Sequence, residues 1–239
     1  LCGGPVPLTG GQATCRPLGA ASLGGGSHPL TASYEGAASY LPGASPTLVQ
    51  VIEPAASALA LDTSGTPTVY GTPVTFTATL SGAGAVPGGA VTFTDGPATL
   101  CGPVPVASGV AQCTTAALLR GAHTVTATST GDANYLGATG SRIQVVTEAT
   151  PTTTLTASPA PSVFGEEVLL AVGVAGVPGG ADPGGTVTIR EGATELCGGP
   201  LPLVGGQASC RKADFPAGDH LLVVTYGGDA NYLPGPPAG

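Results

Sequence analysis

Two sequence markers each occur three times in this chain, and both recur at nearly the same spacing. The first marker is LCGGPVPLTGGQATCRPL from Leu1, LCGPVPVASGVAQCTTA from Leu100 and LCGGPLPLVGGQASCRKA from Leu196. The second marker ends in a tyrosine, and the three tyrosines, Tyr40, Tyr135 and Tyr232, are 95 and 97 positions apart. A period of about 97 residues is the size of one domain and is too long for a solenoid unit. The chain is therefore predicted to be a tandem array of one domain type.

The three copies of the repeat differ in completeness. Residues 1–53 hold only the back half of the repeat, residues 54–149 hold a complete repeat, and residues 150–239 lack the last strand. Because the 239 residues contain no Met, the chain does not begin at an initiator. We therefore expect a fragment or a processed segment of a longer protein.

Short apolar runs in the complete copy alternate with threonine. Val74, Phe76, Ala78 and Leu80 are separated by single threonines, which is the period of a half-buried β-strand. The same pattern predicts strands at 58–62, 91–93, 123–128 and 143–145, and a hairpin of 100–106 with 110–115 around Ser108-Gly109. A hydrophobic fraction of 42% argues against disorder. Short strands separated by turns rich in Gly (40) and Pro (24) predict an all-β fold of tandem Greek-key β-sandwiches.

One strand and the turn after it carry a family resemblance. His123 lies in Gly121-Ala122-His123-Thr124-Val125 and is followed by Gly131-Asp132-Ala133-Asn134-Tyr135; the third copy repeats this order with His220 and Gly228-Asp229-Ala230-Asn231-Tyr232. This order resembles the bacterial Ig-like domain family of long surface and secreted repeat proteins. The resemblance covers essentially the whole chain and implies immunoglobulin-like sandwiches. The first copy departs from the pattern, because Ala37 and Ser39 stand where the Asp and the Asn are expected.

The six cysteines form three local pairs, which are Cys2 with Cys15, Cys101 with Cys113, and Cys197 with Cys210. Each pair flanks a predicted hairpin, and opposite residues of a hairpin lie about 4.5–5.5 Å apart, which suits a disulfide. The closed loops are short, so each bond is expected to contribute about 3 kcal/mol. Zinc is the alternative, but its sites need four ligands and close cysteine pairs. We expect three disulfides, none spanning the sandwich as in antibody domains, and an extracellular or cell-surface location.

The three histidines, His28, His123 and His220, occupy one equivalent position, six residues before Tyr34, Ser129 and Tyr226. A catalytic histidine needs an orienting acid and a nucleophile, and neither recurs with these residues in the sequence. We expect each histidine to bond a neighbouring loop.

The Gly-Asp-Ala-Asn-Tyr segments leave two interpretations open. Asp132 with Asn134, and Asp229 with Asn231, place oxygen ligands two residues apart, as calcium loops do. Asp and Asn also cap turns through their own side chains. No acidic cluster surrounds these pairs in the sequence, so we expect turns, with calcium binding as the alternative.

Several function classes are excluded by the charge and the motifs. With six Lys and Arg and a net charge of −8, the chain is not expected to bind nucleic acid or an anionic membrane. The acidic pair Glu166-Glu167 occurs only once, and no pair of carboxylates recurs as glycoside chemistry would need. The glycine runs at 86–89 and 177–180 lack the lysine and helix of a phosphate loop and are expected to be equivalent turns. We expect no enzyme activity, catalytic residue, cofactor or metal.

The function that these observations favour is a structural spacer or stalk in an adhesin-like protein. The predicted linkers at 53–56 and 148–150 are short and lie beside proline, which should limit swinging. The alternative is an accessory module that binds a carbohydrate or a host or matrix protein. Positions taken to be exposed differ between copies: Ser129 replaces Tyr34 and Tyr226, and Thr114 replaces Arg16 and Arg211. With no recurring aromatic surface, the expected partners are the neighbouring domains of the parent chain.

Overall fold

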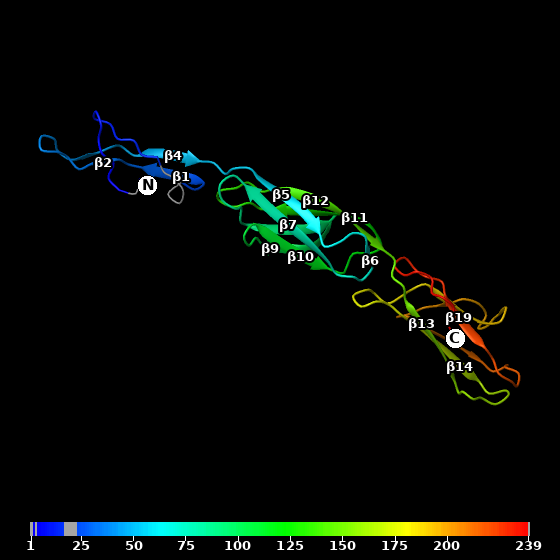
Figure 1. Ribbon diagram of the computed structural model, residues 1–239. Helices are drawn as coiled ribbons and strands as arrows, with labels where there is room; N and C mark the ends of the chain where they lie inside the picture. The colour runs from blue at the N-terminus through cyan, green and yellow to red at the C-terminus, as the bar shows by residue number, and fades with distance from the viewer. Residues whose placement is uncertain (1, 3, 17–22, 239) are drawn as a thin grey trace.

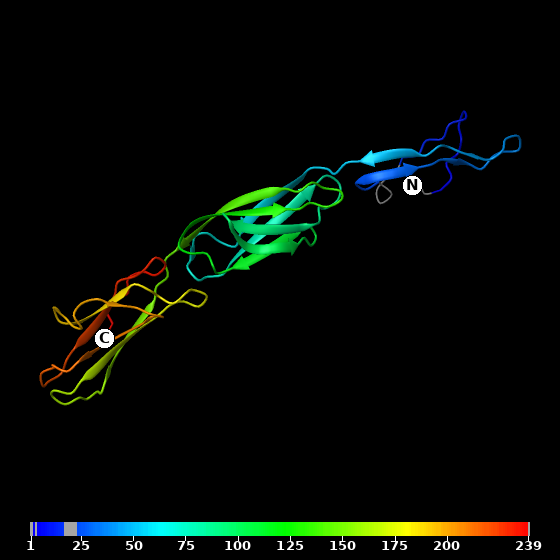
Figure 2. The same ribbon diagram turned by 180° about the vertical axis from the view of Figure 1, so that it is seen from behind.

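The computed structural model describes residues 2, 4–16 and 23–238. These residues form strands, turns and loops without a helix, so the predicted all-β class is confirmed. The strands gather into three groups that follow one another along an elongated molecule in chain order (Figures 1 and 2). We call these groups module 1 (β1–β4), module 2 (β5–β12) and module 3 (β13–β19).

Module 2 is a sandwich of two sheets. Its three-stranded sheet has the order β10 (Val110–Thr115), β7 (Val74–Gly82) and β5 (Ser57–Thr63). Its five-stranded sheet has the order β6 (Thr68–Val69), β12 (Thr139–Thr147), β11 (Gly121–Ser129), β8 (Ala90–Asp95) and β9 (Ala98–Pro105). Neighbouring strands are antiparallel, except that β6 runs parallel to β12.

The core of module 2 lies between the two sheets and is built from the predicted alternating positions. On β7, Val74, Phe76, Ala78 and Leu80 are all buried, and they meet Val91 and Phe93 of β8 and Val125 and Ala127 of β11. The intervening threonines remain partly or fully exposed. The period of two in the sequence therefore predicted correctly which side of these strands faces inward.

The strand predicted at 143–145 exists as part of β12. Ile143 and Val145 lie in β12 but are 61% and 38% exposed, whereas Gln144 and Val146 are buried. Gln144 is accommodated because its side-chain oxygen accepts the Thr63 hydroxyl (2.7 Å) and its nitrogen donates to Thr68 Oγ1 (3.0 Å). A buried amide that is hydrogen-bonded on both sides avoids the cost of an unpaired polar group.

The predicted hairpin around Ser108-Gly109 is wrong in its strand pairing. The turn itself exists, since Ala107 and Val110 exchange two backbone hydrogen bonds of 2.9 and 3.0 Å. Beyond the turn the strands separate, because β9 pairs with β8 in one sheet and β10 pairs with β7 in the other. The segment therefore crosses from one layer of the sandwich to the next.

Module 3 repeats the plan of module 2 with a reduced final strand. One sheet has the order β13 (Thr152–Ser158), β14 (Val168–Ala175) and β18 (Gln207–Lys212). The other contains β15 (Thr186–Glu191), which pairs with β16 (Thr194–Glu195), β17 (Leu201–Pro202) and β19 (Leu222–Tyr226). Where β12 runs along β11 in module 2, a single bridge joins Val224 of β19 to Ala238.

Module 1 consists of two ribbons. β1 (Gly26–Leu30) pairs with β4 (Leu48–Ile52), and β2 (Ser33–Tyr34) pairs with β3 (Gly43–Ala44). None of its described side chains is buried, and Tyr40 is 72% exposed. Among the described residues no second sheet faces these ribbons, so the apolar side chains of module 1 form no buried core.

Candidate functional site

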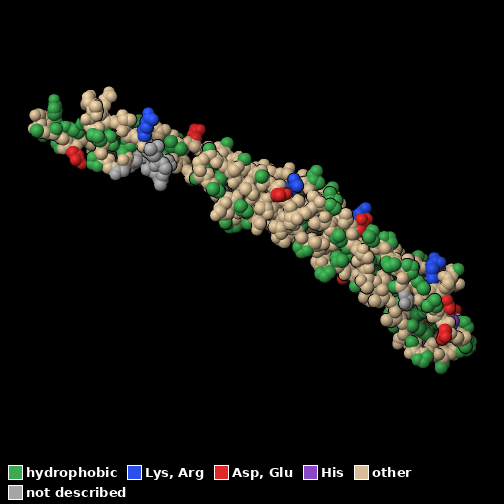
Figure 3. Space-filling view, viewed as in Figure 1, with side chains coloured by type: hydrophobic (Ala, Val, Ile, Leu, Met, Phe, Trp, Pro, Cys, Tyr) green, Lys and Arg blue, Asp and Glu red, His purple; other side chains and the backbone are tan. Residues whose placement is uncertain are grey.

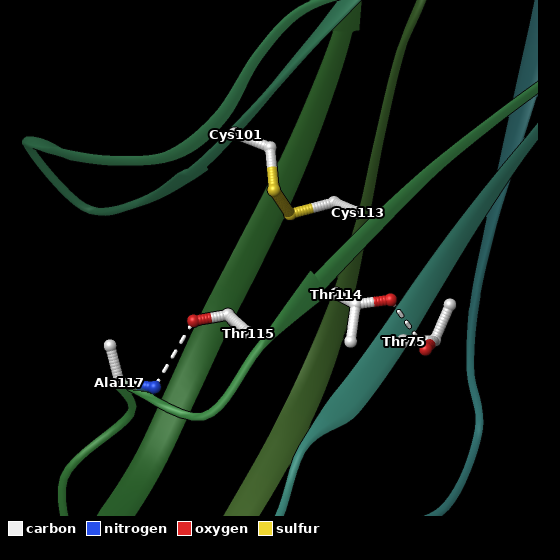
Figure 4. Close-up of a disulfide and its surroundings, with 6 residues drawn as sticks. All are labelled: Thr75, Cys101, Cys113, Thr114, Thr115 and Ala117. Carbon is white, nitrogen blue, oxygen red and sulfur yellow. Dashed lines mark hydrogen bonds between the residues drawn. A yellow bond between two sulfur atoms is a disulfide. The ribbon is translucent and has the colours of Figure 1, made fainter. Parts of the chain in front are cut away.

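The six cysteines form three disulfides, and that of module 2 joins its two sheets. In module 2 a disulfide links Cys101 of β9 to Cys113 of β10, with Cα atoms 5.8 Å apart (Figure 4). The other two predicted pairs, Cys2 with Cys15 and Cys197 with Cys210, are also bonded, with Cα separations of 5.7 and 5.8 Å. β9 and β10 are edge strands of different sheets, so the bond connects the two sheets, although not through interior strands as in antibody domains. The bond closes the sandwich at one edge.

The histidine of module 2 bridges a strand and a loop. Nδ1 of His123 lies 2.6 Å from Oδ2 of Asp95 on β8, and Nε2 lies 2.7 Å from the carbonyl oxygen of Leu119. In module 1 the equivalent His28 contacts only the loop, with Nε2 2.7 Å from the carbonyl oxygen of Gly24. The loop contact agrees with the sequence interpretation. The acid was missed, because it comes from a neighbouring strand.

Module 3 reproduces this arrangement with a different acid. Nδ1 of His220 lies 2.7 Å from Oε1 of Glu191, and Nε2 lies 2.9 Å from the carbonyl oxygen of Pro216. The Pro216 carbonyl and then the Glu191 carboxylate raise the pKa of His220 above its ordinary value. Since both ring nitrogens face acceptors, only the doubly protonated ring satisfies both contacts. The carboxylates of Asp95 and Glu191 therefore hold the two histidine rings in place within their modules.

The Asp of each Gly-Asp-Ala-Asn-Tyr segment organises a turn. Oδ1 of Asp132 accepts the N–H groups of Asn134 (2.8 Å) and Tyr135 (2.9 Å), and Oδ2 accepts the N–H of Gly88 (2.6 Å). The equivalent bonds of Asp229 go to Asn231 (2.7 Å), Tyr232 (2.9 Å) and Gly184 (2.7 Å). Both carboxylate oxygens are thus used by backbone donors in two modules, which is the expected turn-capping role.

These donors also fix the charge of the two carboxylates. The amide of Gly88, followed by those of Asn134 and Tyr135, holds the pKa of Asp132 below its usual range. At Asp229 burial acts to raise the pKa, but three backbone donors outweigh it and the pKa is lowered. In the part of the chain that the structure describes, no group of three or more His, Cys, Asp or Glu side chains is placed to hold a metal ion.

The tyrosine that ends each turn bonds a second loop of the same module. The hydroxyl of Tyr135 lies 2.6 Å from each of the carbonyl oxygens of Ala83 and Ala85, and that of Tyr232 donates to Ala181 (2.7 Å). Both rings are buried. The hydroxyl of Tyr40 bonds no such loop within the described residues of module 1, and its ring is exposed.

The segment that enters each sandwich is bound to the same turn. Ala55, just before β5, donates its N–H to the carbonyl oxygen of Asn134 (2.8 Å) and accepts the N–H of Leu136 (2.8 Å). The equivalent bonds before β13 join Ala149 to Asn231 and Leu233, at 2.9 Å each. The predicted linkers are therefore anchored in the module that follows them. We call this end, formed by the turn and the entering segment, the N-terminal pole of a module.

The Asn side chain of each turn contacts the preceding module. Oδ1 of Asn134 accepts the N–H of Gly25 in module 1 (2.7 Å), and Oδ1 of Asn231 accepts the N–H of Arg120 in module 2 (3.0 Å). Gly25 and Arg120 each lie three residues before the equivalent histidine. The same backbone atom is therefore contacted at both junctions. We call the end that carries this atom the C-terminal pole.

The junction between modules 2 and 3 has a further contact that the sequence did not reveal. Tyr70, which is only 4% exposed, accepts the N–H of Ala181 at its hydroxyl (2.9 Å). Its ring meets that of Tyr232 edge to face, with centroids 5.5 Å apart. The available signal was a large aromatic residue in a turn of a chain with six Tyr and four Phe.

Glycines allow this close approach. A Cβ at Gly179 would lie 2.7 Å from the carbonyl oxygen of Gly71, and one at Gly180 would lie 2.6 Å from the Tyr232 hydroxyl. The predicted equivalence of loops 86–89 and 177–180 is wrong. The residue that donates to the turn carboxylate is Gly88 in module 2 and Gly184 in module 3, so 86–89 corresponds to 182–185. Module 3 therefore has extra loop residues, and they contact module 2.

One of the two positions taken to be exposed in every copy is internal in two of the modules. Ser129 and Tyr226 are 4% and 0% exposed, so their position is internal in modules 2 and 3, and only Tyr34 is exposed there. Thr114 and the equivalent Arg16 and Arg211 are exposed as assumed. The difference at Ser129 therefore reports on core packing and says nothing about a shared binding surface.

The two sandwiches with their capped turns match a known family. The family described as "Bacterial Ig-like domain (group 3)" matches residues 61–148 and 155–237. The chain belongs to this family. The resemblance drawn from the sequence is thereby confirmed, and the matched segments coincide with modules 2 and 3 of this bacterial Ig-like chain. Such Ig-like domains are typically non-catalytic.

Several solved structures are similar to this bacterial Ig-like chain, at TM-scores of 0.33 and below. They include the fibronectin(III)-like modules of Clostridium thermocellum CbhA (16% identity, 75% of this chain and 90% of that one, TM-score 0.30). Others are the titin domains z1z2 in complex with telethonin (20%, 74% and 91%, 0.33) and a Ca²⁺-stabilised adhesin with which an Antarctic bacterium binds ice (18%, 87% and 55%, 0.29). No curated protein matches the chain. Among the described residues, no helix is long and apolar enough to span a membrane.

Proposed function

We propose that this chain is a structural spacer in a bacterial cell-surface or secreted, adhesin-like protein and holds the neighbouring domains of the parent chain apart. The observation that carries the proposal is the junction. Two linker bonds and one Asn side-chain bond recur at both junctions, so both junctions share the same set of backbone and Asn contacts. With nine-residue strands such as β7 and β11, a sandwich is roughly 30 Å long at about 3.3 Å per residue.

The surrounding chemistry supports the same proposal. Three disulfides suit an oxidising compartment, which favours an extracellular or cell-surface location. The few charged side chains are scattered over the face seen in Figure 3, without the basic patch that nucleic acid or an anionic membrane would require. The proposal assigns the chain no catalytic residue, cofactor or metal.

Small-angle X-ray scattering on the whole chain tests the spacer. Three modules held end to end should give a radius of gyration above about 25 Å, whereas a compact globule of this length has about 18 Å. The distance distribution should show the long tail of a rod. A radius near the compact value would contradict the spacer.

A second candidate, an accessory binding module, is favoured by the C-terminal pole of module 3. An open cavity of about 400 Å³ there is lined in part by Phe164, Phe215 and His220, and Phe164 is 80% exposed. The sequence analysis found no aromatic surface of this kind. A glycan array and a matrix-protein panel test it. A saturable interaction tighter than about 10 μM, or about −7 kcal/mol, that Phe164→Ser abolishes would favour the binding module.

A further inference from the structure

The two junctions share a contact whose residues are far apart in the sequence. Asn134 and Gly25 are 109 positions apart, and Asn231 and Arg120 are 111 positions apart. In both cases the amide oxygen of a turn residue binds one backbone N–H at the C-terminal pole of the preceding module. The contact occurs at both junctions with the donor at the same position, so it is a feature of the repeat itself.

We propose that Asn134 and Asn231 are orientation locks, which fix the angle between a module and its predecessor. The inference rests on the proposed spacer function and specifies how that function is achieved. In each lock, the side-chain oxygen of the Asn binds a backbone N–H of the preceding Ig-like module.

The turn holds the Asn in place before the contact forms. The N–H of Asn134 is bound by Asp132 (2.8 Å), and its carbonyl oxygen is bound by Ala55 (2.8 Å). The N–H and carbonyl oxygen of Asn231 are bound in the same way by Asp229 (2.7 Å) and Ala149 (2.9 Å). With its main chain held on both sides, the residue loses little further freedom when its side chain binds, which favours an otherwise weak contact.

The Asn contact gives each pair of modules a second point of attachment, in addition to the chain segment that joins them. The entering segment alone connects the modules along one line, and a module can rotate about that line. The Asn bond lies off that segment and removes this rotation. Because the segment already keeps both poles together, the bond forms within one molecule at high effective concentration, which compensates for its solvent exposure.

The two junctions differ in how much they depend on the lock. Between modules 2 and 3, the buried Tyr70 adds its hydrogen bond to Ala181 and its contact with Tyr232. Between modules 1 and 2 the described residues provide no aromatic contact of this kind. Asn134 should therefore contribute more to its junction than Asn231 contributes to the other.

Hydrogen exchange and scattering on the full chain test the lock together. In Asn134→Ala the Gly25 amide should exchange about three- to tenfold faster, as expected for the loss of one hydrogen bond. Asn134→Asp keeps an acceptor oxygen and should preserve most of the protection. In Asn231→Ala the Arg120 amide should respond in the same direction, while the scattering curve changes less than in Asn134→Ala.

The controls separate the lock from folding and from the spacer function. Ser39→Ala changes the equivalent residue of module 1 and should alter neither measurement. Gly25→Ala disturbs the same junction from the side of module 1 and leaves the sequence of the turn unchanged, since its Cβ would collide with the carbonyl of Ala133. Unchanged amides of β8 and β11 in Asn134→Ala would show that module 2 remains folded. An extended wild type whose Gly25 amide and scattering are unaffected by Asn134→Ala would overturn the lock alone. A wild type that bends freely at both junctions would contradict the spacer and the lock together.

Discussion

Asp132 and Asn134 are two positions apart and have different tasks. The carboxylate serves its own module, because it binds three backbone N–H groups of that module. The amide side chain binds the preceding module. The first task was predictable, since Asp before a turn commonly caps it. The second was not, because the partner is a main-chain atom that has no signature in the sequence.

His220 leads to a prediction about pH. Its folded-state pKa is raised by the Pro216 carbonyl and by Glu191, so the protonated ring stabilises module 3. This stabilisation is fully present below the unfolded value of about 6.5 and is lost as the pH rises through the higher folded-state pKa. The melting temperature of module 3 should therefore fall from about pH 6 to 8, and His220→Gln should remove that part of the slope.

The comparison for this experiment is His28→Gln, which changes the equivalent ring of module 1. Among the described residues that ring bonds only the Gly24 carbonyl. The His28→Gln substitution should therefore leave the pH dependence of the melting temperature of module 3 unchanged. A slope that persists in His220→Gln would show that another group of module 3 is responsible.

Strand positions followed from the sequence far better than strand pairing did. The alternation around Val74 and Phe76 located β7 and its inward face, and β5, β8 and β11 also fell at predicted sites. These features depend on residues near one another in the chain. The pairing of β9 with β8 and of β10 with β7 depends on distant partners, and the turn at Ser108-Gly109 looks the same whether or not its strands stay together.

Because β9 and β10 belong to different sheets, the disulfide between them should stabilise the packing of one sheet on the other. Cys101 and Cys113 tie the two layers of module 2 together, and Cys113 is buried at 1% exposure. Replacing both by alanine should lower the free energy of unfolding of module 2 by about 3 kcal/mol, as for a loop of this length. Urea unfolding of the double variant against wild type measures this. An unchanged midpoint would mean that the bond adds nothing to the closed sandwich.

The pair Cys2 and Cys15 supplies the matched control, because it lies in module 1, where no described side chain is buried. Its double alanine variant should leave the unfolding of module 2 unchanged. Intact mass of the untreated protein should also be lower by six hydrogens than that of the reduced protein, two for each of the three disulfides. Six thiols that react with an alkylating reagent without reduction would contradict the bonding pattern.

Across the whole molecule, protection from exchange should follow the amount of core in each module. Amides of β7, β8 and β11 should exchange most slowly, because their side chains form the closed core of module 2. Those of β19 should be less protected, since on the side where β11 pairs with all of β12, β19 is joined through the Val224–Ala238 bridge and the bond from Gly235 to Tyr226. Module 1 should exchange fastest. Uniform protection measured by mass spectrometry in all three modules would contradict this order.

The donor that each Asn binds belongs to the main chain, and this has an evolutionary consequence. Gly25 and Arg120 have nothing in common as side chains, yet both present the same N–H to the next module. A duplicated gene segment therefore inherits the donor and the acceptor of this hydrogen bond without needing a matching side chain in its neighbour. Selection can then vary the copy number, and with it the reach of the protein, in a single recombination step.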